Sequence, residues 1–582
     1  MTMNQPVRNK KEKSRSGCLV CKRRRVKCDE QEPSCQRCIK IGTECPGYKR
    51  PVKWSTKYEK TAVSDRNTAN VCRGKTSRLA ERDQRLPVLP ENPTLLAPTH
   101  LEDVPRPIET REFDTVLVSG TLKSIVCHVL SSFDSLHNPF RSEVPRLFNQ
   151  SPLLLYCVLS MSAAHLYQNE ESKIAVPLEL QTKAISYLAG QLPTPPPIDG
   201  LEVSIRHEST VGRFVGSNIQ DDVLLGTILL GMTSAWHDVS STGLVHLHGS
   251  RELFKAWMSS SHLNTTNDRR VMGATQDFVI SSMVYWEAMT SFIVDQDTDA
   301  LSYLDVFCHL PCSLKRYPCP WTGVGTATFI YLAKTAALVR RLRALRRSSS
   351  GMFQRSDGIT QDTSYYSDLL RQATVLIQSI SALEAPTVSS VTDIGDVFTP
   401  PGHLIAMERC YRLAALLELS RAFPEVVGTH VVQNHDAGLN DDEQEKNRPV
   451  ERVCNLALRI LWIMEGIPVT SGTVSTQLLP LIIAGSVLGL VSRENIAGEG
   501  IEFLGSSKEV ARWRDFVKIR TRWLYQLIRL KPVRHGLLIL EEVWARLDNL
   551  DAADCSGDLI PKSQNHHWID VMEERGLETM LG

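Results

Sequence analysis

Six cysteines between residues 18 and 45 constrain this chain more than any other feature of its sequence. They are spaced C-x2-C-x6-C-x6-C-x2-C-x6-C, and the segment is an internal repeat because each half has the pattern C-x2-C-x6-C. The six are Cys18, Cys21 and Cys28 in the first half and Cys35, Cys38 and Cys45 in the second. A C-x2-C turn lets two thiolates reach one ion, and a structural zinc takes four ligands in a tetrahedron. The spacing therefore predicts a metal-binding module.

The number of sulfur atoms predicts how the ions are held. Two zinc ions need eight ligand positions and only six thiolates are present, so two sulfur atoms must bridge. The simplest closed arrangement is a binuclear cluster of two structural zinc ions that share the first cysteine of each half, Cys18 and Cys35. This choice of bridging residues follows the symmetry of the repeat.

Two other interpretations of the six cysteines remain open. Three disulfides could hold such a segment, but residues 1–17 are polar and basic and do not resemble a secretory signal, which favours a reducing compartment. One zinc ion could also bind four of the cysteines and leave two thiols over. The paired spacing favours the binuclear cluster over both.

The two halves of the repeat differ in charge. Five of the six residues between Cys21 and Cys28 are cationic, whereas the corresponding segment after Cys38 has one cation and one acid. The five cations are Lys22, Arg23, Arg24, Arg25 and Lys27. Such a surface suits phosphates, and arginine can also donate two hydrogen bonds to guanine O6 and N7. The first half is therefore predicted to face nucleic acid.

The same stretch resembles the DNA-binding domain of the fungal Zn2Cys6 binuclear-cluster transcription factors. The family pattern is a Cys-x-x-Cys turn, a basic run ending in Lys-Cys-Asp, and then Pro-x-Cys-x-x-Cys, which this chain matches over residues 18–29 and 33–38. In that family the first and fourth cysteines bridge, and a helix after the second cysteine reads a CGG-type triplet in the major groove. By this resemblance Arg24 and Arg25 read bases. Lys22 stands where family members often have arginine, which bears on a phosphate contact and not on the fold.

Charge is polarised along the 582 residues although the formal net charge is only +1. Residues 1–60 hold 17 Lys+Arg against 6 Asp+Glu, so the remainder is acidic, which suits a protein that touches DNA only near its N-terminus.

Residues 1–17 are predicted to be a basic arm that serves nuclear import or phosphate contacts or stays solvated. Residues 18–45 are the predicted DNA-binding domain, and 46–111 a linker whose prolines forbid a continuous helix.

From about residue 112 to 550 the chain consists of long segments with helical apolar periodicity. Expected helices cover roughly 116–133, 152–166, 221–236, 243–259, 275–295, 325–347, 364–384, 402–423, 449–465, 475–491, 508–530 and 536–549. Few stretches alternate with period two. The expected architecture is therefore a small binuclear zinc-cluster domain at the N-terminus, followed by a large all-α regulatory domain.

Two of these segments resemble the regulatory domain of one large branch of the fungal cluster factors. Residues 236–251 are similar to its tryptophan followed by a His-Leu-x-Gly-Ala element, with Ser250 where alanine is usual. Residues 479–485 are similar to its late Pro-x-x-x-Ala-Gly helix. The resemblance implies a helical domain that responds to an effector or dimerises.

Other patterns in the body have simpler interpretations. Cys308, Cys312 and Cys319 lack a C-x2-C turn and are predicted to be structural thiols. The apolar run 478–491 is too short to span a bilayer and is predicted to be a packed core helix. Five arginines between residues 340 and 347 are predicted to form a solvated face rather than a second nucleic-acid site.

Residues 551–582 form a predicted acidic C-terminal tail. Residues 541–582 contain ten Asp+Glu and three Lys+Arg, interleaved with apolar side chains. Such a segment can be an acidic-hydrophobic activation segment that keeps its apolar side chains available to a partner. Alternatively, 564–582 is a last amphipathic helix docked on the body, and the helical spacing of Trp568, Val571 and Met572 favours this second interpretation.

No complete catalytic motif of the G-x-S-x-G, H-E-x-x-H, G-x-G-x-x-G or phosphate-loop type is present, so the chain is not expected to be an enzyme. A cluster that binds protein or RNA is another alternative, disfavoured because RNA-binding zinc knuckles and fingers do not share this spacing.

The resemblance implies a nuclear, sequence-specific transcription factor for RNA polymerase II genes, with CGG-type targets and control of metabolic or biosynthetic gene clusters. Expected partners are double-stranded DNA, a second copy through the helical body, and co-regulators, with no membrane.

Overall fold

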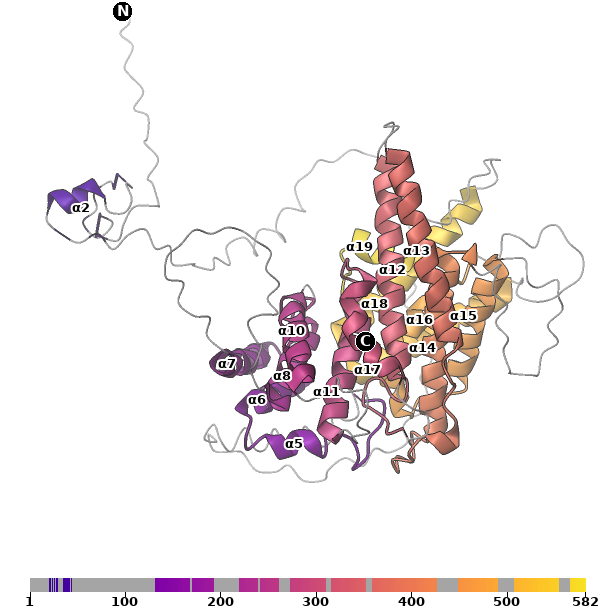
Figure 1. Ribbon diagram of the computed structural model, residues 1–582, viewed down its shortest axis with the longest axis horizontal. Coiled ribbons are helices and arrows are strands. Elements are labelled where there is room, and N and C mark those ends of the chain that lie inside the picture. Colours follow the sequence, from indigo (N-terminus) through magenta and orange to yellow (C-terminus); the bar gives the residue numbers. More distant parts are fainter. Residues whose placement is uncertain are drawn as a thin grey trace, which may run out of the picture. The chain divides into compact units, whose positions relative to one another are not determined.

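The computed structural model describes most of the chain after residue 130 and part of the cysteine repeat (Figure 1). The described ranges are 131–167, 170–192, 219–238, 241–260, 273–309, 316–351, 358–426, 449–489, 507–553 and 566–581. Within the repeat they are 20, 21, 24, 26, 28, 29, 35–41, 43 and 45. The chain divides into two compact units, residues 1–103 with the cysteine repeat and residues 104–582 with nearly all of the described helices.

The second unit is built from α-helices (Figure 1). The longer ones are α6 (Pro152–Leu166), α7 (Val176–Gln191), α8 (Asp221–Met232), α10 (Leu244–Ser260), α11 (Ala274–Thr290), α12 (Thr326–Gly351), α13 (Gly358–Ser381), α14 (Pro401–Ala422), α15 (Pro449–Glu465), α16 (Leu478–Gly485), α17 (Ser507–Ile528) and α18 (Lys531–Ala553). The shorter elements are α5 (Glu143–Leu147), η2 (Glu171–Lys173), α9 (Ser234–His237), η4 (Thr298–His309), η5 (Val388–Ser390), η8 (Gly472–Thr476) and α19 (Trp568–Glu574). The described part of this unit contains no strand, only two isolated bridges, Arg316–Val391 and Cys319–Gly323. The prediction of a large all-α domain is confirmed.

Most of the predicted helices are present within a few residues of their expected bounds. The segment predicted at 402–423 is α14, and the one predicted at 508–530 is α17. α7 was not predicted. The expected helix at 116–133 lies outside the described residues except for its last three, which are not helical.

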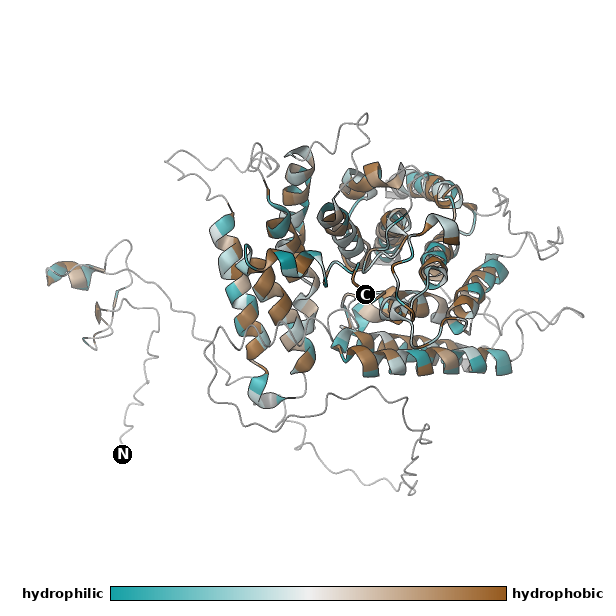
Figure 2. Cartoon of the chain, turned by 90° about the horizontal axis from the view of Figure 1, so that it is seen from below, coloured by the Kyte–Doolittle hydropathy of each residue, from teal (hydrophilic) through white to brown (hydrophobic). Residues whose placement is uncertain are grey.

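The centre of the second unit is formed by helices that are apolar on all sides. Every residue of α16 is buried, and so is every residue of α8 after its first two. α16 packs against α14, α15, α17 and α18, while α8 packs against α6, α7, α10 and α11. Figure 2 shows outer helices with hydrophilic and hydrophobic sides. No described helix is long and apolar enough to cross a membrane, and the 478–491 run begins with the packed helix α16.

One close approach explains a glycine in the centre. A Cβ atom on Gly231 of α8 would lie 2.2 Å from the ring of Trp286 on α11. The Trp286 side chain is fully buried and cannot move aside without disturbing its neighbours. Glycine therefore lets these two helices approach each other.

The arginines near the end of α12 correct one prediction. Arg340 and Arg343 are only 5% and 8% exposed and do not form a solvated face. Arg340 Nη1 lies 2.7 Å from Glu573 Oε1, and Arg343 Nε donates to Asp570 Oδ1 at 2.8 Å. The sequence prediction was wrong for these two residues because Glu573 and Asp570 are more than 220 residues further along the chain. Arg340 Nε also donates to Asp295 Oδ1 at 2.9 Å, from a segment 45 residues earlier.

The end of the chain is packed into the second unit. Trp568, Ile569, Val571 and Met572 of α19 are 0% exposed and belong to the main apolar core. Trp568 contacts Phe292, with ring centroids 5.3 Å apart, and α19 packs against α18. Of the two interpretations of the acidic C-terminal tail, the docked helix therefore holds for residues 566–581.

Candidate metal centre and nucleic-acid interface

Four of the six predicted metal ligands form the buried core of the first unit. Their exposed fractions are 2% for Cys21, 7% for Cys28, and 0% for Cys35 and Cys38. Cys45 is half-buried and packs against them together with Val20. Because sulfur atoms make up most of this core, the described part of the unit has little apolar material with which to hold its own fold.

The spacing of two sulfur atoms fits coordination by a common metal. Cys21 Sγ and Cys35 Sγ are 3.7 Å apart, far beyond the roughly 2.05 Å of a disulfide bond. Four sulfur atoms placed about 2.3 Å from a zinc ion at the corners of a tetrahedron are about 3.8 Å from one another. The distance therefore matches a shared tetrahedral ion and excludes a disulfide between these two cysteines.

Cys35 occupies the central position of the cluster. The Sγ atom of Cys35 lies within 4.8 Å of the sulfur atoms of Cys21 and Cys38. It also lies within 4.8 Å of the sulfur atom of Cys28 and of a carboxylate oxygen of Asp29, which form a second group of potential ligands. A sulfur atom that takes part in two ligand groups can contact two ions. The residues present therefore fit the zinc centre that the sequence predicts, with thiolate sulfur as the ligand that zinc accepts in structural sites.

The backbone repeats together with the cysteines. The amide of Val26 donates to the Cys21 carbonyl at 3.1 Å, and the amide of Thr43 donates to the Cys38 carbonyl, also at 3.1 Å. Both bonds join a second cysteine of a half to the residue five positions later. The internal repeat of the sequence is thus also a repeat of local structure.

A short helix orients the second half. Cys35 caps α2 (Gln36–Lys40), and its Sγ accepts a hydrogen bond from the Cys38 amide at 3.4 Å. The Gln36 amide donates to Asp29 Oδ2 at 2.9 Å, which joins the two halves. These two bonds fix the positions of Cys35 and Asp29 at the start of α2.

Among the five predicted DNA-binding residues, the structure describes Arg24. Its side chain is exposed. Its amide donates to the carbonyl of Val20, four residues earlier, at 3.0 Å, so the backbone makes one helical turn between these two residues. The other four predicted residues, Lys22, Arg23, Arg25 and Lys27, lie outside the described residues, as does the ligand Cys18. Asp29 is part of the Lys-Cys-Asp pattern but was not among the predicted site residues.

Comparisons with known proteins agree with this division into a cluster and a helical body. The family model described as "Fungal Zn(2)-Cys(6) binuclear cluster domain" matches residues 16–55. The family model described as "Fungal specific transcription factor domain" matches residues 123–582. These models describe transcription regulators with a zinc-binding DNA-binding domain, and not a class of enzymes.

Curated relatives match short stretches of the chain. "Transcriptional regulatory protein moc3" of Schizosaccharomyces pombe is 53% identical over 38 residues, 6% of this chain and 8% of that protein. "Aspercryptin biosynthesis cluster-specific transcription regulator atnN" of Emericella nidulans is 56% identical over 36 residues, 6% of each chain. "Sterol uptake control protein 2" of Candida albicans is 33% identical over 95 residues, 16% of this chain and 13% of that protein.

The chain thus covers 13% or less of the length of these three relatives. No solved structure matches. The second family model nevertheless spans most of the chain, and the first spans the whole cysteine repeat. The chain belongs to the fungal specific transcription factors, with a Zn(2)-Cys(6) binuclear cluster domain at its N-terminus.

Proposed function

We propose that this chain is a sequence-specific DNA-binding regulator of RNA polymerase II genes that acts in the nucleus. The observation that carries the proposal is the basic run at residues 22–27 within the first half of the repeat. Cys21 is buried in the sulfur core, whereas Arg24, three residues later, is exposed. A metal-held core followed at once by an exposed arginine within a basic stretch of sequence suits a surface that enters a DNA groove.

The roles of the basic residues divide by geometry and chemistry. Arg24 and Arg25 are assigned to base edges, because a guanidinium can donate to both O6 and N7 of a guanine in a CGG-type site. Lys22, Arg23 and Lys27 are assigned to phosphates, which fix the register of the protein on the duplex but carry no sequence information. The basic arm before Cys18 adds charge that increases affinity for any duplex.

The metal centre in this proposal contains two zinc ions held by all six cysteines, with Cys18 and Cys35 bridging. The central position of Cys35 in two ligand groups supports this assignment. Bound zinc supplies the folding free energy that a core made mainly of sulfur atoms does not. The chain itself orients the thiolates through the two equivalent backbone hydrogen bonds, from Val26 to Cys21 and from Thr43 to Cys38, and through the cap of α2.

Zinc content tests the number of ions. The purified full chain should contain two zinc ions per molecule, and Cys35→Ala should remove at least as much zinc as Cys21→Ala, because Cys35 serves both ions. Cys308→Ala is the matched control, since Cys308 lies in the helical body, and it should leave the zinc content unchanged. A content of one zinc ion per molecule would contradict the bridged cluster.

Binding to short duplexes tests the reading of bases. Arg25→Ala should cost about 1–3 kcal/mol on a CGG-bearing duplex and leave binding to a scrambled duplex nearly unchanged. Arg37→Ala is the matched control, because Arg37 is exposed on α2 in the second half, and it should preserve the preference for CGG. Lys11→Ala should weaken both duplexes alike and lower the salt slope by about one unit. Equal losses on both duplexes for Arg25→Ala would remove Arg25 from base reading.

Control of a metabolic or biosynthetic gene cluster is the finer part of the proposal. One matched relative is named as a regulator specific to a biosynthesis cluster. Pairing of two copies through the helical body and contacts with co-regulators belong to the same proposal and rest on the family resemblance. Genome-wide mapping of bound sites tests it, because it gives the DNA motif, the half-site spacing and the neighbouring genes together.

A further inference from the structure

The turn between α17 and α18 lies in a stretch that has cations but no acids. Residues 516–540 contain six Lys+Arg and no Asp+Glu, although the chain after residue 60 is acidic in total. Four of the six cations are exposed, namely Arg522, Arg529, Lys531 and Arg534. The second unit therefore has a basic surface at this turn.

The four exposed cations have no acidic partner. None of them forms an ion pair within the described part of the chain. The side chain of Arg529 donates to its own helix, from Nε to the Gln526 carbonyl at 3.3 Å. In contrast, Arg371 on α13 is 70% exposed and still pairs with Asp368 at 2.7 Å. Exposure alone therefore does not explain why the cations at the turn are unpaired.

Two histidines beside the turn are affected by this charge. Burial is the main cause that lowers the pKa of His535 on α18, and the charges of Arg534 and Lys531 act in the same direction. Burial also lowers the pKa of His165 on α6, and the charge of Arg529 adds to it. The positive potential thus extends to residues of two different helices.

Helix stability does not account for Lys531 and Arg534. The N-terminal end of a helix carries partial positive charge and is stabilised by acids, whereas cations are stabilising at the C-terminal end. Arg529 is placed favourably, because its amide donates to the Tyr525 carbonyl at 2.8 Å where α17 ends. α18 begins at Lys531 and has no acidic residue in its first turn. The two cations at this end oppose the helix dipole.

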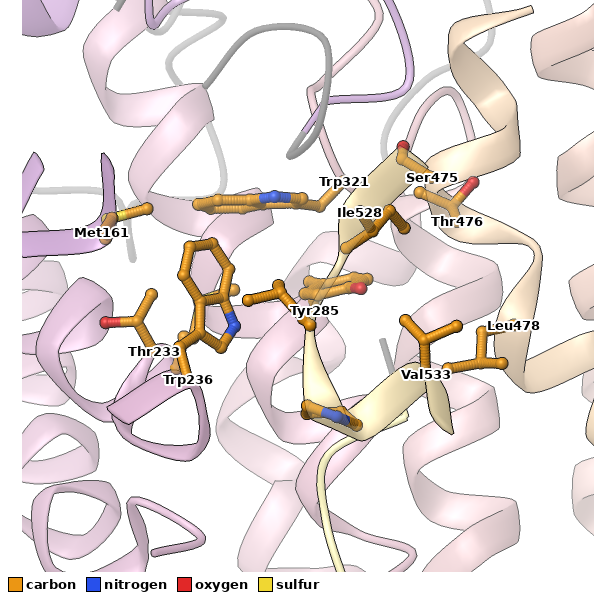
Figure 3. A pocket seen from close by; sticks show the side chains of 13 residues that line it. Met161, Thr233, Trp236, Tyr285, Trp321, Ser475, Thr476, Leu478, Ile528 and Val533 are labelled. Carbon is orange, nitrogen blue, oxygen red and sulfur yellow. The ribbon is translucent and has the colours of Figure 1, made fainter. Parts of the chain in front are cut away.

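Apolar side chains are exposed between the cations. Ile519 is 66% exposed and Tyr525 is 39% exposed. With 3.6 residues per turn, Ile519, Arg522, Tyr525 and Arg529 lie within about 120° of one another around α17. The opposite side of this helix faces the interior, where Ile528 lines a small cavity (Figure 3). The outer side of α17 therefore combines apolar and cationic side chains.

We propose that this surface binds an amphipathic helix of a partner protein, with apolar side chains on one side and aspartate or glutamate on its flanks. We call it the turn surface, and it consists of Ile519, Arg522, Tyr525, Arg529, Lys531 and Arg534. The apolar side of the partner would cover Ile519 and Tyr525, and its carboxylates would pair with the cations. This goes beyond the proposed function, because it concerns the helical body and does not depend on DNA binding.

The exposed apolar side chains favour a protein helix over other polyanions. A DNA backbone would use the cations but would leave Ile519 and Tyr525 without an apolar contact. An anionic lipid surface binds a helix whose apolar side is continuous, and here Arg522 and Arg529 interrupt it. An acidic amphipathic helix fits both kinds of side chain.

Fluorescence anisotropy with the full chain tests the proposal with three synthetic helical peptides of about 15 residues, which span about 22 Å. The first has leucine on one side and glutamate on its flanks, the second has glutamine in place of glutamate, and the third has alanine in place of leucine. We expect the first to bind saturably at one site per chain and the others to bind about tenfold more weakly. Added salt should weaken the first peptide and leave the glutamine peptide unchanged.

Two pairs of variants connect the binding to the turn surface. Arg522→Gln should weaken the acidic peptide about twofold to fivefold, whereas Arg371→Gln makes the same change on α13 and should have no effect. Ile519→Ser should weaken it about threefold to tenfold. Its control is Val375→Ser on α13, at a side chain that is 50% exposed.

A third variant separates binding from stability. Lys531→Glu replaces a cation by an acid at the start of α18, so it should raise the midpoint of urea unfolding. The same change should weaken the acidic peptide at least as much as Arg522→Gln. A lower midpoint would show that Lys531 serves the fold and would remove it from the turn surface.

The proposal is overturned if the glutamine peptide binds as tightly as the acidic one, or if Arg522→Gln and Ile519→Ser have no larger effects than their controls. It is also overturned if these variants lose affinity for a scrambled duplex or for phosphatidylserine vesicles while they keep the acidic peptide. Far-UV circular dichroism verifies that each variant is folded. Binding to a CGG-bearing duplex should be unchanged in every variant, so a failure of this proposal is distinct from a failure of the proposed function.

Discussion

His567 should make the folded protein lose stability as the pH falls below 7, and the structure gives the magnitude. The residue caps α19, and its Nδ1 accepts a hydrogen bond from the Ile569 amide at 3.2 Å. Nε2 lies 2.9 Å from Glu418 Oε2 and therefore carries the proton that it donates to this carboxylate. The two bonds together require the neutral tautomer, because a protonated imidazole could not accept from Ile569.

The surroundings of His567 oppose its protonation. Burial lowers its pKa to about 3, the cations Arg343 and Arg421 act in the same direction, and Glu418 opposes them. Burial acts to raise the pKa of Glu418, but its interaction with His567, the charge of Arg421 and the hydrogen bond from Trp568 outweigh burial, so its pKa is lowered. The buried pair is therefore a neutral imidazole beside an ionised carboxylate.

The sign and size of the effect follow from proton binding. In the unfolded chain His567 takes up a proton near pH 6.5, whereas in the folded chain it does so only near pH 3. Because the unfolded state binds the extra proton in between, stability falls as the pH falls through this window. From pH 7.5 to 5.5 the loss from this residue amounts to about 1.4 kcal/mol in the free energy of unfolding.

Two substitutions that do not titrate isolate this contribution. His567→Gln retains a donor for Glu418, and His567→Asn retains an acceptor for the Ile569 amide. Both should therefore flatten the pH dependence by about the same 1.4 kcal/mol, although their absolute stabilities differ. Urea unfolding of the full chain at pH 7.5 and 5.5, followed by circular dichroism, measures the difference. Other histidines, such as the half-buried His237 with a pKa lowered by burial to about 4, cancel because they are present in all three proteins.

The reasoning would be refuted if both variants kept the full pH dependence of the wild type. A histidine proton resonance that titrates near pH 6.5 in the wild type and is missing from both variants would refute it as well, because it would show that His567 is protonated as easily in the fold as in water.

Two further predictions concern the core. Gln477 is 0% exposed, and neither its amide nitrogen nor its amide oxygen has a hydrogen-bond partner in the described part of the chain, so Gln477→Met should raise the free energy of unfolding by about 1 kcal/mol. A loss of that size in urea unfolding would instead show that the amide has a polar partner. Gly231→Ala should cost about 1–3 kcal/mol because its Cβ would meet Trp286, whereas Gly249→Ala on α10, with open space around it, should gain about 0.5–1 kcal/mol. The same sign of change at both glycines would contradict the packing argument.

The sequence predicted what depends on short-range patterns. The six cysteines predicted a module that the structure describes as a buried sulfur cluster with a repeated backbone bond. Long periodic segments predicted α14, α15 and α17 within a few residues. α7 escaped prediction because its inner side carries only a few apolar residues, while Leu178 and Ile185 remain about half exposed on its outer side. Its helical period is therefore blurred in the sequence.

A small cavity lined by Trp236, Tyr285 and Trp321 could not be predicted because no short pattern encodes it. Trp236, Tyr285 and Trp321 stand far apart in the sequence, and each alone is a common core residue. Only the fold brings these three residues to one cavity together with Ile528 and Val533. The same holds for Glu418 and His567, which are separated by 149 residues and meet in the core.

The arginines of α12 and the acidic C-terminal residues form ion pairs with each other, which accounts for the position of both groups in the fold. Taken separately, the arginines suggested a solvated face, whereas the acidic residues left open either an activation segment or a docked helix, with the docked helix favoured. In the fold, Arg343 pairs with Asp570, and Arg340 and Arg347 both pair with Glu573. Burial of Arg343 without Asp570, or of Asp570 without Arg343, would leave a charge without this partner at a cost of several kcal/mol, so these two residues are buried together. The apolar side chains of α19, which lie between these acids in the sequence, supply the core contacts that make this joint burial favourable.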